Sequence, residues 1–123
     1  MNKELNTRAD IVLLVNSFYD KVKQDAQINP FFEEVANVNW NQHLTIMYDF
    51  WENVLLHTGK YDGNPMVKHQ NIHHKKPLSK EDFMQWQKLF NATIDENFSG
   101  KNADLAKLRA KNIATVMQAK ILP

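Results

Sequence analysis

The 123-residue chain has no cysteine, only three glycines and four prolines, and no long hydrophobic run. Without cysteine it cannot form disulfides, thiolate metal sites or cysteine-bound iron–sulfur clusters, and its composition suits a reducing compartment. No apolar stretch approaches the roughly 18 residues of a membrane span, and no signal-peptide core follows Met1. These absences predict a cytoplasmic protein with no membrane partner.

The chain also lacks an excess of either charge, since 15 basic residues face 14 acidic ones and leave a net charge of +1. A nucleic-acid partner is therefore not expected. Apolar residues make up 43% and charged residues 24%, which is typical of a globular protein. The length suits one core, so residues 1–123 are expected to form a single domain.

Helical spacing dominates the first third of the chain. Thr7 and Asp10 have the spacing of a capping box, and the apolar residues that follow recur at steps of three or four. A proline at the first helical position after Asn29 predicts a short second helix carrying Phe31, Phe32 and Val35. The first helix is expected to bury Ile11, Leu14, Val15, Phe18, Tyr19 and Val22.

The middle of the chain predicts two helices separated by a glycine-rich break at Gly59 and Gly63. Asn39 can cap the first, and Asn64-Pro65 repeats the capping arrangement of Asn29-Pro30 for the second. The second helix carries Met66, His69, Ile72 and His73 on one side. The inward face predicted for the first comprises Trp40, His43, Met47, Phe50, Trp51 and Val54.

Two long helices are predicted for the last third. Ser79 and Asp82 form a second candidate capping box, and Gly100 is placed to stop the helix that follows. Asn102 opens the last helix, whose broad apolar side predicts a central packing role. No segment alternates with a period of two, so the fold class is all-α. The inner face of the first long helix comprises Phe83, Trp86, Phe90, Ile94 and Phe98.

The histidines that follow the glycine-rich break are candidate ligands. His69 lies about one turn into a proline-capped helix, as an axial haem ligand does in helical proteins, although a lone helical histidine is more often a surface or hydrogen-bonded residue. His69 and His73 could share a metal at i and i+4, but no glutamate or third histidine completes such a site. His73 and His74 fit a solvated helix end better.

Three polar-tipped residues lie on otherwise apolar helical stripes: Tyr19, His43 and Trp86. Each donor needs a partner if it is buried, because an unsatisfied donor costs roughly 1–3 kcal/mol. Three donors around one cavity would suit a small, partly negative ligand. The alternative is that backbone carbonyls satisfy each donor separately.

Taken together, these motifs resemble the truncated haemoglobins, and specifically their group III branch. The resemblance runs from about Ile11 to Met117 and includes the absence of the glycine motifs of other branches. The motifs are Phe18-Tyr19, Asn29-Pro30-Phe31-Phe32, Trp40-x-x-His43, Phe50-Trp51, Tyr61-x-Gly63-x-Pro65-x-x-x-His69 and Phe83-x-x-Trp86-x-x-Leu89-Phe90.

The resemblance implies a two-over-two helical sandwich around haem b, in which His69 is the proximal iron ligand. It makes Tyr19, His43 and Trp86 the distal residues that stabilise a ligand, with His43 also a candidate iron ligand. Where many members carry an arginine beside the tryptophan, this chain has Gln85. Lys68, Lys75 and Lys76 are then candidate partners of the haem propionates. The expected haem-contact or supporting residues are Phe32, Met47, Phe50 and Trp51.

The implied function is binding of O₂, NO, CO or peroxide. NO detoxification and peroxidase-like chemistry are the candidate activities, each of which would need a reductase. A pocket with several donors suits chemistry or sensing better than rapid oxygen transport. A monomer is expected. The competing interpretation is a haem-free helical sensor or interaction domain, whereas a small hydrolase lacks a recognisable nucleophile and carboxylate arrangement.

Overall fold

The computed structural model describes residues 3–30, 40–57 and 79–121. The described residues form helices α1 (Arg8–Gln24), α2 (Trp40–Leu56), α4 (Lys80–Asn97) and α5 (Lys101–Ile121). Within these ranges the only β-type pairing is one isolated bridge between Lys3 and Phe98. No helix in the described ranges is long and apolar enough to cross a membrane.

Both predicted capping boxes are confirmed. In α1 the Thr7 side chain accepts a hydrogen bond from the Asp10 backbone N–H, and the Asp10 carboxylate accepts one from the Thr7 N–H. Ser79 and Asp82 exchange the same two bonds at the start of α4. Each box satisfies two backbone donors that a helix N-terminus leaves without an intrahelical partner, which fixes where these helices begin.

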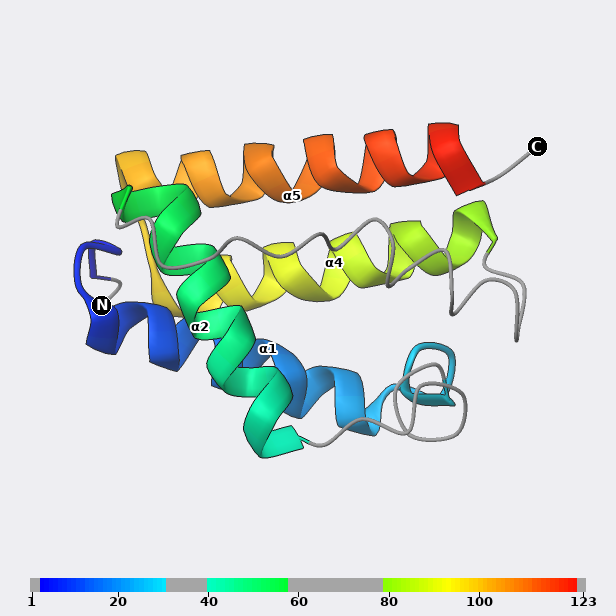
Figure 1. The fold of residues 1–123 in the computed structure, drawn as a ribbon, viewed down its shortest axis with the longest axis horizontal. Helices are drawn as coiled ribbons and strands as arrows, with labels where there is room; N and C mark the ends of the chain where they lie inside the picture. The colour runs from blue at the N-terminus through cyan, green and yellow to red at the C-terminus, as the bar shows by residue number, and fades with distance from the viewer. Residues whose placement is uncertain (1–2, 31–39, 58–78, 122–123) are drawn as a thin grey trace.

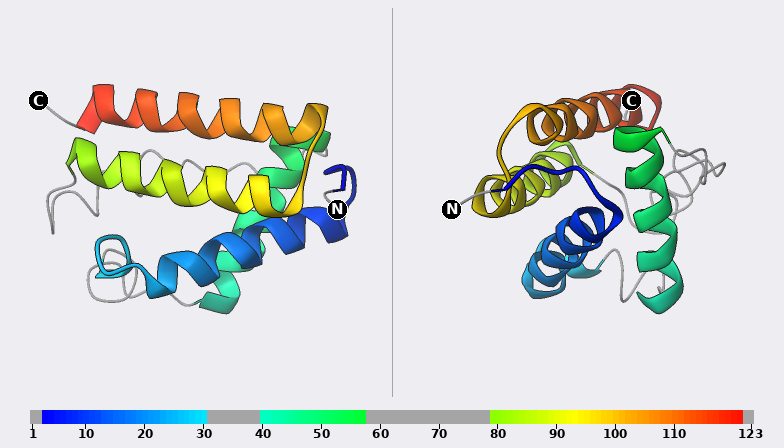
Figure 2. Two further views of the ribbon diagram at one scale, coloured as in Figure 1. Left: turned by 180° about the vertical axis from the view of Figure 1, so that it is seen from behind. Right: turned by 90° about the vertical axis from the view of Figure 1, so that its left-hand side faces the viewer.

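The helices pack as two pairs, α1 with α2 and α4 with α5, and the pairs meet mainly where α1 packs on α4. Figure 1 shows α4 and α5 side by side while α2 crosses α1 steeply, and the right-hand view in Figure 2 shows α2 standing beside the other helices, which are seen end-on. The core between the pairs includes Ile11, Leu14, Phe18, Phe90 and Ile94, each no more than 2% exposed. This arrangement confirms the predicted all-α fold.

The inward face predicted for α2 is only partly correct. Of the predicted residues Trp51 alone is fully buried, and Glu52 and Leu55 are buried beside it. The stripe formed by His43, Met47, Phe50 and Val54 is half-buried although it is largely apolar. These residues recur at steps of three or four and so share one side of the helix, displaced from the side that Trp51 and Leu55 occupy.

The central role predicted for the last helix is wrong. Helix α5 contacts α4 along its length and α2 only briefly, so it lies at the edge of the bundle (Figure 1). Its alanine stripe is buried, whereas Leu108 and Val116 are 52% and 48% exposed. Apolar residues on two adjacent stripes indicated a broad contact face, but only one stripe meets a described neighbour.

An ion-pair cluster fastens the N-terminal end of α1 to α2. Arg8 Nη1 lies 2.7 Å from Asp49 Oδ1 and 2.7 Å from Glu52 Oε2, and the guanidinium carbon lies 5.7 Å from the centre of the Tyr48 ring. The Tyr48 hydroxyl lies 2.5 Å from Asn16 Oδ1. Glu52 is 5% exposed, and a buried carboxylate needs such a partner because losing it would leave an uncompensated charge. The cluster therefore helps to fix how α1 and α2 cross.

Asp10 makes the stability of α1 depend on pH. Burial raises the pKa of its carboxyl, but the ammonium of Lys3 and the backbone N–H groups of Asn6 and Thr7 hydrogen-bond to it and lower the pKa to about 2, from 3.8. The unfolded chain thus binds this proton more readily than the folded chain. The resulting stability is present above pH 3.8 and is lost as the pH falls through about 2.

Asp10→Asn, which keeps an oxygen acceptor but removes the charge, is expected to lower the unfolding free energy by about 1 kcal/mol at neutral pH, after allowance for solvent screening. Urea unfolding of wild type and variant at a series of pH values checks this. The difference between the two proteins should shrink as the medium is acidified toward the pKa of Asp10, and a difference that is constant over the whole series would contradict the assignment.

Candidate functional site

Two of the predicted distal residues lie against each other. Tyr19 comes from α1 and His43 from the first turn of α2, and their ring centres lie 5.0 Å apart in an edge arrangement of 83°. Tyr19 is 6% exposed, and burial raises the pKa of its phenol well above the usual range. The hydroxyl therefore stays protonated near neutral pH and can act as a hydrogen-bond donor.

Trp86 approaches the same region from α4 through an aromatic contact. Its ring meets Phe18 edge-on at 5.8 Å, and Phe18 meets Tyr19 at 4.9 Å. Trp86 also stacks on Phe90 at 5.8 Å with the ring planes 15° apart, and Phe90 in turn contacts Phe18 at 5.3 Å. Phe18 thus lies between the two predicted donors, and the Phe90 ring limits how the indole can turn.

The predicted contact residues of α2 separate into two groups. Met47 and Phe50 are half-buried on the same stripe as His43, whereas Trp51 is 5% exposed and stacks on Phe90 at 4.9 Å. Trp51 therefore supports the core behind the candidate site. Met47 and Phe50 extend an apolar surface along α2 from His43.

The other predicted site residues lie outside the described ranges. These are the proximal candidate His69 with His73 and His74, the contact residue Phe32, and the candidate propionate partners Lys68, Lys75 and Lys76. Their roles stay predictions from the sequence. Within the described part of the chain, no group of three or more histidine or acidic residues is placed to hold a metal ion.

Gln85 is hydrogen-bonded to Asp25. Its side-chain amide donates a hydrogen bond of 2.7 Å to Asp25 Oδ2, next to the end of α1. Asp25 also accepts hydrogen bonds from the backbone N–H groups of Gln27 and Ile28 through its other oxygen. The residue beside Trp86 therefore joins α4 to the turn after α1.

Two further residues lie beside the Tyr19 and His43 pair: Trp40, which the sequence placed on the same inward face as His43 but without a site role, and Lys23, which the sequence analysis missed. Trp40, the first residue of α2, lies 5.7 Å from Tyr19 and 5.9 Å from His43, measured between ring centres. The ammonium of Lys23 lies 4.6 Å from the centre of the Trp40 ring. Lys23 follows Tyr19 by four residues, so the spacing could have indicated that these two residues share a helix face, as it did for Trp40 and His43.

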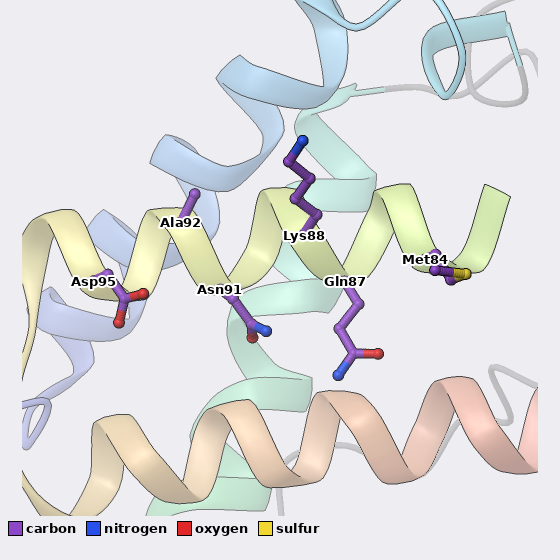
Figure 3. A pocket seen from close by; sticks show the side chains of 6 residues that line it. All are labelled: Met84, Gln87, Lys88, Asn91, Ala92 and Asp95. Atoms are coloured by element: carbon purple, nitrogen blue, oxygen red, sulfur yellow. The ribbon is translucent and has the colours of Figure 1, made fainter. Parts of the chain in front are cut away.

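An open depression runs along α4 away from these residues (Figure 3). In the close-up, Asn91 and Gln87 extend toward α5 while Lys88 and Ala92 project from the opposite side of the helix. None of the predicted site residues lines it. Its lining residues are Met84, Gln87, Lys88, Asn91, Ala92 and Asp95.

No family model matches the chain. The group 3 truncated haemoglobin ctb of Campylobacter jejuni subsp. jejuni serotype O:2 is 29% identical to it over 121 residues, which cover 96% of this chain and 93% of the relative. The crystal structure of the group III truncated haemoglobin from Campylobacter jejuni superposes with a TM-score of 0.85 at 28% identity, covering 98% of this chain and 95% of that one. The resemblance predicted from the sequence is thereby confirmed: the chain has the two-over-two globin fold and is similar to group III truncated haemoglobins over nearly its whole length.

Proposed function

We propose that the protein is a haem-binding globin, with haem b as its cofactor and small ligands such as O₂, NO, CO or peroxide on the side of Tyr19 and His43. The observation that carries the proposal is the position of this pair at one end of the half-buried stripe of α2. That stripe continues through Met47, Phe50 and Val54. A flat apolar group with a polar ligand at its centre fits such a surface, because apolar walls cover the group while donors meet the ligand.

The cofactor would supply an iron atom that could bind a small ligand such as O₂. His69 is the residue proposed to hold this iron. The chain's own contribution on the other side is a set of donors in a water-poor environment, where hydrogen bonds are stronger. Tyr19 can donate its O–H to a ligand atom that carries partial negative charge, and Trp86 can donate its indole N–H. His43 can do the same or bind the iron itself.

Absorption spectra of the purified protein test the proposal. After incubation with haemin, a Soret band is expected in the oxidised protein, with shifts on reduction and on addition of CO. A protein that takes up no haem and is stably folded without it would instead be a haem-free sensor or interaction domain. NO consumption and peroxide turnover with an added reductant are the assays for the two proposed activities.

Tyr19→Phe tests the donor role. Hydrogen bonds to charged groups contribute about 1.5–3 kcal/mol, so loss of the hydroxyl is expected to speed O₂ dissociation about ten- to hundredfold. CO carries less negative charge and should dissociate with a smaller change. Stopped-flow ligand replacement measures both rates.

Tyr48→Phe is the matched control for this measurement. It removes a phenol hydroxyl from α2 whose partner is Asn16, on the side where Arg8 lies. Its O₂ dissociation rate should stay near that of wild type. Equal rates in Tyr19→Phe and wild type would mean that Tyr19 donates no hydrogen bond to the ligand.

A further inference from the structure

Four residues from two helices meet at the end of α1. Tyr19 and Lys23 lie one turn apart on α1, and Trp40 and His43 lie one turn apart at the start of α2. The Trp40 ring contacts the rings of both Tyr19 and His43, and the Lys23 ammonium lies over it at 4.6 Å. Trp40 is therefore the shared neighbour of the other three.

Solvent exposure decreases from Lys23 through Trp40 to Tyr19. Lys23 is exposed, Trp40 is half-buried, and Tyr19 is buried. On this side of the pair, Trp40 thus lies in contact with both the exposed Lys23 and the buried Tyr19. Trp40 is a rigid ring that must turn away if a small molecule is to pass on this side.

Lys23 is bonded to the turn after α1 through its backbone and to Trp40 through its side chain. Its carbonyl oxygen accepts a hydrogen bond of 2.6 Å from the Asn29 side-chain amide, beyond the end of α1. The ammonium lies 4.6 Å from the centre of the Trp40 ring, although the side chain itself is exposed. Cations over the face of tryptophan form the strongest interactions of this kind with aromatic side chains.

From this arrangement we propose that Trp40 is a gate between solvent and the Tyr19 and His43 pair, and that Lys23 holds the gate closed through its contact with the indole ring. The proposal rests on the proposed function, since the gated molecule is the small ligand of the haem iron. It assigns to Trp40 and Lys23 the control of how fast ligands enter and leave. Tyr19 controls how firmly they are held.

A gate and a donor have different kinetic signatures. Opening a gate lowers one barrier that entry and exit share, so association and dissociation rates rise together and the equilibrium affinity stays nearly constant. Loss of a donor raises the dissociation rate and weakens the affinity. Flash photolysis of the CO complex and stopped-flow O₂ replacement separate the two cases.

The contact itself can be measured without ligand binding. A ring current from Trp40 should move the Cε methylene protons of Lys23 upfield in the NMR spectrum of the purified protein. The shift should vanish in Trp40→Leu. A Lys23 methylene at its ordinary position in the wild-type protein would overturn the proposal.

Lys23→Met and Trp40→Ala are the kinetic variants. Loss of an exposed cation–π contact should raise both rate constants about two- to fivefold in Lys23→Met. Removal of the indole should raise them on the order of tenfold in Trp40→Ala. Lys21→Met is the matched control, because Lys21 is a lysine of the same helix that pairs with Glu96, and its rates should equal those of wild type.

Each outcome decides the matter. A protein without a Soret band would overturn the proposed function and the gate with it. A Soret band with unchanged rates in both gate variants would overturn the gate alone. A change in dissociation rate without a matching change in association would show that these residues hold the ligand and do not gate it. Far-UV circular dichroism of each variant confirms that the helices are intact.

Discussion

Substitution of His69 by alanine is expected to abolish stable haem binding, so that the reconstituted variant loses most of its Soret absorbance on gel filtration. The reason is chemical: cysteine is absent from the chain, and an imidazole is the ligand that the group III resemblance assigns to the iron at this position. The spacing of Tyr61, Gly63 and Pro65 before His69 carries that assignment. The measurement is the ratio of Soret to protein absorbance after removal of unbound haemin.

His73→Ala and His74→Ala are the controls for this experiment, because the consecutive histidines leave open a register in which His73 binds the iron instead of His69. Both should keep wild-type spectra. Imidazole added to His69→Ala should restore part of the Soret band by occupying the vacated position. Wild-type spectra in His69→Ala, or loss of the band in His73→Ala, would show that the proximal assignment is wrong.

The ends of two helices could be predicted from the sequence because their signals are local. Thr7 with Asp10 and Ser79 with Asp82 satisfy backbone donors within one turn, so the motif itself contains both partners. The buried face of α1 was predicted correctly for a related reason. It is packed against both α2 and α4, so every residue of its apolar stripe from Ile11 to Val22 meets a neighbour.

Faces that meet a neighbour on only one side could not be predicted in this way. Periodicity identifies which residues share a stripe, but the stripe's burial depends on how far the neighbouring element extends. In α5 the stripe with Leu108 lies outside the contact with α4. In α2 the stripe of Met47 and Phe50 stays half-buried, which is the feature that we relate to a bound cofactor.

The candidate site could not be predicted from any single segment, because its residues come from different helices. Tyr19, His43 and Trp86 were singled out as polar tips on apolar stripes, and the resemblance gave them a common purpose. The approach of Tyr19 to His43 depends on how α1 crosses α2, and the Arg8 ion pairs with Asp49 and Glu52 help to set that crossing across more than 40 positions of sequence. No local pattern indicated that Arg8 would reach α2.

Phe90→Ala is expected to lower the unfolding free energy by about 3–5 kcal/mol. Phe90 is the position at which the support of the candidate site by the core is tested most strongly. Phe90 is 1% exposed and contacts three aromatic rings of the described residues: it stacks on Trp51 at 4.9 Å and on Trp86 at 5.8 Å, and it meets Phe18 edge-on at 5.3 Å. Truncation therefore leaves a cavity and removes the ring that keeps the Trp86 indole in place. The loss exceeds that of ordinary surface substitutions because the surrounding rings can close the space only in part.

Urea unfolding followed by circular dichroism, with and without haemin, measures this cost. Met84→Ala is the control, since it truncates a large apolar side chain of the same helix that is 58% exposed, and its effect should stay within about 0.5 kcal/mol. Phe90→Leu keeps most of the side-chain volume and should recover more than half of the lost unfolding free energy.

If Phe90 also positions Trp86, ligand dissociation should become faster in Phe90→Leu, as it should in Trp86→Phe, although the leucine variant remains folded. Unchanged ligand rates in a destabilised Phe90→Leu protein would limit Phe90 to a packing role and leave the orientation of Trp86 to its contact with Phe18.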